Sequence, residues 1–76
     1  MPRFYFDICE NDEIATDEVG LELPDLHAAE IEATQSLADM AKDMLPGIDG
    51  QNIGVVVRNE RGPLFKAAII YDFTRH

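Results

Sequence analysis

The longest periodic segment of the chain is residues 24–47, in which apolar residues recur at intervals of three and four. This spacing places them on one side of an α-helix. They are Leu26, Ala29, Ala33, Leu37, Met40 and Met44, with Ala41 beside them. Asp25 can accept amide protons of the first turn, and Pro46 disfavours a helical conformation in the residue before it. The pattern predicts a helix that begins after Asp25, ends near Met44 or Leu45, and covers a core with one face.

The segments on both sides of this helix alternate between apolar and polar residues, which is the period of a β-strand. In the first of them Phe4, Phe6 and Ile8 share one face. A short second strand is expected to carry Ile14 inward. The predicted strands are residues 3–9, 13–16, 52–58 and 64–73, with an ordered loop at 17–23 and a turn at 59–63.

The predicted order of elements is ββαββ, two hairpins joined by the helix. This order indicates an α+β fold with a four-stranded, mostly antiparallel sheet and one helix packed on one face. The strand order stays open, because the first and last strands both have the apolar content of central strands. A chain of 76 residues is a single domain, residues 1–76, with no room for a second core.

One helix leaves part of the sheet uncovered, because it is about 10 Å wide and covers one face of a sheet about 14 Å across. By the strand alternation, the second face has apolar side chains among charged ones. We expect this face to be a self-association surface and the protein to be a homodimer, formed by stacking these faces or by pairing edge strands. An unidentified protein partner and the ordinary scatter of exposed aliphatic residues are the alternatives. The predicted association residues are Tyr5, Val56, Leu64, Ala68 and Ile70.

Composition narrows the classes of partner. Six Lys and Arg against fifteen Asp and Glu give a formal charge of −9, which repels polyanions, so no nucleic-acid partner is expected. The apolar content of 46% argues against disorder, and the apolar runs are too short to cross a bilayer, so no membrane partner is expected. The N-terminal residues lack the features of a secretory signal, and the single Cys9 fits a reducing compartment. We therefore expect a cytoplasmic protein.

No motif in the chain predicts catalytic residues, a cofactor site or a metal site. Acidic residues crowd the N-terminal third, but their spacing does not match a calcium loop, and a solvated acidic edge is the commoner explanation. Cys9 could act as a nucleophile only with a base such as His27, and no local sequence signature supports that pairing. Asp7 and Asp72 would form a carboxylate pair only if the first and last strands were neighbours. The crowded acids are Glu10, Asp12, Glu13, Asp17, Glu18 and Glu22.

Several segments taken together, MPRFYFDI, DEVGLELPD and VRNERGPL with the helix between them, resemble a family of short bacterial proteins that is defined as a domain of unknown function. The resemblance covers nearly the whole chain and implies no activity. Residues 22–26 also resemble small antitoxin-like domains, which implies a protein that masks a partner. The sequence therefore favours a non-catalytic protein-binding or self-associating module. A small enzyme or ligand-binding domain with a site on the sheet, and an antitoxin-like domain, are the alternatives.

Overall fold

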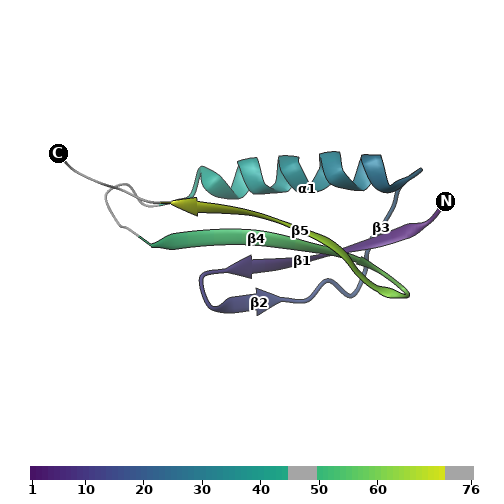
Figure 1. Ribbon diagram of the computed structural model, residues 1–76, viewed down its shortest axis with the longest axis horizontal. Helices are drawn as coiled ribbons and strands as arrows, with labels where there is room; N and C mark the ends of the chain where they lie inside the picture. The colour runs from purple at the N-terminus through teal and green to yellow at the C-terminus, as the bar shows by residue number, and fades with distance from the viewer. Residues whose placement is uncertain (45–49, 72–76) are drawn as a thin grey trace.

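One α-helix lies against an antiparallel β-sheet (Figure 1). The computed structural model of the protein describes residues 1–44 and 50–71. No helix within those residues is long and apolar enough to span a membrane. The elements in chain order are β1 (Arg3–Glu10), β2 (Glu13–Ala15), β3 (Leu21–Glu22), α1 (Leu26–Ala41), β4 (Gln51–Asn59) and β5 (Gly62–Tyr71).

The sheet has the strand order β2-β1-β4-β5, and β3 pairs with the N-terminal half of β1 beside β2. The α+β class and the antiparallel sheet are therefore confirmed, but the predicted number of four strands is wrong because the sheet has five. The fifth strand lies within residues 17–23, which were predicted to be a loop. A strand of two residues, Leu21 and Glu22, is too short to show a period in the sequence.

The N-terminus of α1 is capped as predicted. The Ala28 N–H donates a hydrogen bond of 2.9 Å to the Asp25 carboxylate, which satisfies one amide that has no partner inside the helix. The helix ends at Ala41, three residues before Met44, and Lys42 caps its C-terminus. Of the predicted core stripe, Leu26 is 47% exposed; it is the first residue of the helix, and burial begins one turn later, at Ala29.

The core lies between α1 and the facing sides of β1, β4 and β5. Ala29 and Ala33 are completely buried, and their small side chains let the helix approach the sheet closely. Val55 and Val57 of β4 are also completely buried, and each such side chain contributes about 1.5 to 3 kcal/mol of hydrophobic free energy. The other buried core residues are Phe4, Leu37 and Ile53, with Phe6, Ile8, Phe65, Ala67 and Ile69 packed around them.

Ile14 does not point into this core as predicted, because its side chain is 71% exposed. In the register of β1 and β2, Ile14 lies opposite Cys9 and therefore on the same face of the sheet as Cys9. That face is the one turned away from α1, since the neighbouring Ile8 packs against the core. The prediction for Ile14 was wrong because it assigned the wrong side of the strand.

Candidate functional site

The sheet face turned away from α1, here called the open face, is built by β1, β4 and β5. Cross-strand pairing places Tyr5 opposite Arg58 and Cys9 opposite Gly54, and Gly54 opposite Ala68. Two of the predicted association residues are exposed large aliphatic side chains, Leu64 at 42% and Ile70 at 76%.

The remaining predicted association residues differ in how accessible they are. Ala68 is exposed, whereas Tyr5 and Val56 are half-buried. The Arg58 guanidinium carbon lies 4.6 Å from the centre of the Tyr5 ring, a cation–π contact that covers one side of that ring. The apolar part of the open face that is free to contact another molecule is therefore concentrated on β5.

A shallow depression crosses the open face above Gly54, because this position has no side chain. A Cβ atom there would lie 3.2 Å from Lys66 Cε, so the aliphatic part of Lys66 extends across the sheet toward Gly54. The depression brings together one thiol, one ammonium group and amides. Its lining includes Cys9, Asn52, Gly54, Lys66, Ala68 and Ile70.

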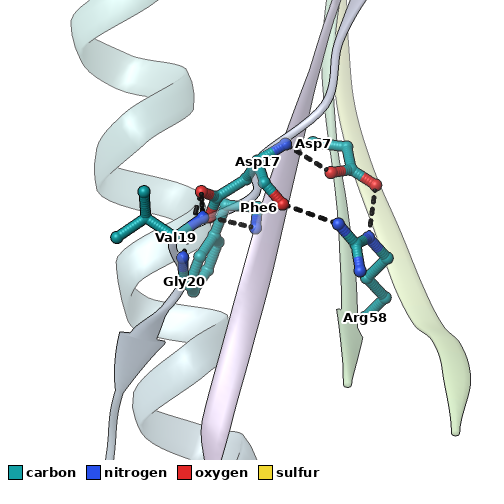
Figure 2. Close-up of polar contacts among 6 residues, drawn as sticks. All are labelled: Phe6, Asp7, Asp17, Val19, Gly20 and Arg58. Atoms are coloured by element: carbon teal, nitrogen blue, oxygen red, sulfur yellow. Dashed lines mark hydrogen bonds and ion pairs between the residues drawn. The ribbon is translucent and has the colours of Figure 1, made fainter. Parts of the chain in front are cut away.

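The densest polar cluster surrounds Asp17, in the connection between β2 and β3 (Figure 2). The Asp17 carboxylate accepts hydrogen bonds from the backbone N–H groups of Phe6, Val19 and Gly20, at 3.1, 3.0 and 3.1 Å. Two of these donors fold the connection into a turn around the carboxylate, and the third lies on β1. The cluster therefore fixes the connection to the first strand.

Arg58 joins this cluster from β4 (Figure 2). Its Nε donates to Asp7 Oδ2 at 2.9 Å, and its Nη2 donates to the backbone carbonyl of Asp17 at 2.6 Å. The Asp17 N–H donates to Asp7 Oδ1 at 2.8 Å. Three segments that are far apart in the sequence are thereby connected by charge-assisted hydrogen bonds.

Both aspartates of the cluster are held in the ionised form. Burial alone would raise the pKa of Asp7, but the hydrogen bonds from Arg58 and from the Asp17 N–H outweigh it and lower that pKa. Burial likewise opposes ionisation of Asp17, and its backbone N–H donors lower the pKa below the ordinary value. The hydrogen bond to Asp7 raises the pKa of Arg58. A general base needs a pKa near the working pH, so these groups are poorly suited to proton transfer.

Gly20 completes the connection because no other residue fits there. Its φ of +77° favours glycine, and a Cβ atom would lie 2.9 Å from both Arg3 Cγ and Tyr5 Cε1. Arg3 also holds this connection, because its side chain donates a hydrogen bond of 2.8 Å to the Val19 carbonyl. Its other contact is an ion pair of 3.2 Å with Glu22. The polar groups of this region are thus used to hold the chain together.

The structure does not bring together the other pairs considered from the sequence. Cys9 lies on the open face and His27 lies on the helix, on the opposite side of the sheet. Asp72 lies outside the described residues. The first and last strands, β1 and β5, are not neighbours, because β4 lies between them. Among residues 1–44 and 50–71, no three His, Cys, Asp or Glu side chains lie close enough to hold a metal ion.

No pattern in the sequence pairs Asp17 with Arg58. The spacing of Asp17 and Gly20 is a local signal, since an aspartate that accepts from following backbone amides is a common turn. Arg58 has no such signal. Its position beside Asp7 depends on the pairing of β1 with β4, and the two residues are 51 positions apart.

These features define a small α+β domain with one helix on an antiparallel sheet. The family model described as a domain of unknown function (DUF6894) matches residues 3–70, and the chain belongs to that family. The resemblance recognised in the sequence is thereby confirmed. Neither the curated proteins nor the solved structures contain a significant match.

Proposed function

We propose that the chain is a non-catalytic module that acts by binding protein, and that its partner is a second copy of itself. The observation that carries the proposal is the exposure of two large aliphatic side chains of β5, Ile70 at 76% on the open face and Leu64 at 42% beside the register shift near the start of the strand. Exposed apolar side chains with charged residues around them are typical of association surfaces.

The polar chemistry of the fold supports binding over catalysis. Asp7, Asp17 and Arg58 are hydrogen-bonded to one another, and both carboxylates have lowered pKa values. A ligand-binding or enzymatic role would have to use the depression above Gly54. There Cys9 and Lys66 are the only reactive side chains among the residues that line it in the described chain, and no histidine or carboxylate stands beside them.

Sedimentation tests the proposal directly. The wild type at micromolar concentration is expected to sediment at twice the chain mass of 8.5 kDa. The double variant Leu64→Lys with Ile70→Lys is expected to be a monomer, because it places two charges in the apolar contact. Thr34→Lys with Gln35→Lys adds the same charge on the exposed side of α1 and should leave the dimer intact. A monomeric wild type would refute self-association, and a dimer lost in both double variants would show a general effect of charge.

A further inference from the structure

The two edges of the sheet differ in length and in charge. On one edge, β2 and β3 cover parts of β1 and have only three and two residues. On the other edge, β5 has ten residues, with one register shift in its pairing with β4 beside Leu64. No strand of the described chain pairs with the outer side of β5. The acids of the first edge, all exposed, are Glu10, Asp12, Glu13, Glu18 and Glu22.

The outer side of β5 is a template for another strand. In an antiparallel strand, alternate residues direct their N–H and C=O groups away from the paired neighbour, so β5 presents a row of such groups. Pro63 lacks a donor, but it is only the second residue of the strand. The single charged residue of β5, Lys66, extends toward Gly54 and the interior of the open face. Its charge is therefore not directed at an approaching strand.

Charge selects a partner for this edge. Two copies that each carry a formal charge of −9 repel one another unless their contact avoids carboxylates. The segment Gly62–Tyr71 contains no acidic residue, so two β5 strands can lie side by side without opposing acids. At the other edge, Glu13 and its acidic neighbours would face their own copies, and like charges directly opposite are destabilising.

We infer that β5 pairs antiparallel with β5 of a second copy about a two-fold axis perpendicular to the sheet, which makes the two sheets continuous. This inference rests on the proposed self-association and specifies its geometry. Identical strands pair symmetrically, as a closed dimer requires. The half-buried side chains Phe65, Ala67 and Ile69, at the margin of the core, become enclosed between the copies.

The position of the helix is compatible with this arrangement. α1 packs on β4 and β5 and lies toward the β5 side of the sheet (Figure 1). Strands are spaced by about 4.8 Å, so a helix above the interval between β4 and β5 would lie about 10 Å from its symmetry mate. Packed helices approach to about 8 to 10 Å. The two helices would therefore lie side by side on one face of the continuous sheet.

Cross-linking of single cysteines along β5 tests the inference. In a Cys9→Ser background, each variant carries one cysteine and is treated with a short bismaleimide. Side chains near the two-fold axis lie about 5 Å apart, and each residue further along separates the copies by about 7 Å more. Dimer yield should therefore peak at one or two adjacent scanned positions and exceed the two control positions at least tenfold. The scanned changes are Leu64→Cys, Lys66→Cys, Ala68→Cys and Ile70→Cys, and the controls are Ile14→Cys on β2 and Val56→Cys on β4.

Each alternative has a distinct result. The highest yield at Val56→Cys would mean that the open faces of two copies stack. The highest yield at Ile14→Cys would mean that the copies pair through the opposite edge of the sheet. Either result would overturn pairing through β5 but would leave the proposed self-association intact. A wild-type dimer that cross-links at none of the six positions also overturns it. A wild-type monomer in sedimentation refutes both the inference and the proposed function. Circular dichroism and labelling with a monofunctional maleimide confirm that each variant is folded and its thiol reactive.

Discussion

Removing the Asp17 side chain should destabilise the protein strongly, although the residue is an acid in a loop. In Asp17→Ala the N–H groups of Phe6, Val19 and Gly20 lose their acceptor. The hydrogen bonds to Phe6 and Gly20 are part-buried, whereas the one to Val19 is exposed and water can replace it. A buried N–H without a partner costs about 1 to 3 kcal/mol. Because these two groups are only part-buried, each should cost about 1 to 2 kcal/mol, the lower part of this range. The predicted loss in the free energy of unfolding is therefore about 2 to 4 kcal/mol.

Thermal and urea denaturation followed by circular dichroism measure this loss. For a domain of this size, 1 kcal/mol lowers Tm by about 4 to 8 °C, so Tm should fall by about 10 to 30 °C. Glu18→Ala is the matched control, because Glu18 is the adjacent acid and is exposed, and it should change the free energy by less than about 0.5 kcal/mol. Equal effects for Asp17→Ala and Glu18→Ala would refute the reasoning, since the carboxylate would then not hold the connection.

Three further predictions concern other parts of the fold. Gly20→Ala and Gly50→Ala both place alanine at positive φ, 77° and 79°, but only Gly20 has other atoms close to the added Cβ. Gly20→Ala should therefore lower Tm much more than Gly50→Ala. Equal losses would mean that the backbone conformation alone causes the destabilisation. Asp25→Ala should cost about 1 kcal/mol in urea titrations by removing the helix cap, and Asp39→Ala, on the exposed side of α1, close to nothing. Because the pKa of Asp7 is lowered from 3.8 in the folded state, its ionised form stabilises the fold above that pH. The stability difference between wild type and Asp7→Asn should therefore shrink as the pH falls below 3.8, toward the lower pKa of the folded state. A constant difference would contradict the assignment.

The sequence predicts the start of the helix better than its end, for a physical reason. Asp25 acts on backbone groups three residues away, so the cap can be recognised locally. Pro46 only sets a limit that the helix cannot pass. The helix stops earlier, at Ala41, and the chain then forms turn contacts in which the Asp43 and Met44 N–H groups donate to carbonyls three residues back. Nothing in the apolar period distinguishes this turn from another turn of helix.

The error over Ile14 shows how the register of a short strand is determined. Glu10 pairs with Glu13 across a two-residue turn, so Cys9 pairs with Ile14 and both lie on one face. Because Phe4 and Ile8 share the core face, strand alternation puts Cys9 on the other face, and the same turn length implies an outward Ile14. A strand of three residues has too few positions for its own apolar pattern to decide between faces. The hairpin, and not the hydrophobicity of Ile14, fixes its side.

The Asp17 cluster could be predicted only in part, because its local and long-range contacts have different origins. The turn around Asp17 follows from residues within three positions of it. The contact with Arg58 spans 41 residues and requires β1 to lie beside β4, and the sequence leaves that strand order open. Strand alternation, in contrast, is a local property of the sequence, and the side chains of Leu64 and Ile70 are 42% and 76% exposed.

The two edges of the sheet differ in how well they are protected against pairing with another strand. This difference is the strongest physical reason to look for a partner at β5. At the outer edge of β1, two short strands and the connection around Asp17 occupy the backbone groups, and the acids there repel another strand. These are devices by which proteins prevent edge-to-edge pairing. In the described part of β5 the corresponding devices are Pro63 near its start, the register shift beside Leu64, and a lysine that extends inward. All residues from Phe65 onward keep a regular register with β4. An edge of ten residues with so little protection is expected to be paired in the functional state, and a second copy is the partner whose β5 brings no acid to the contact.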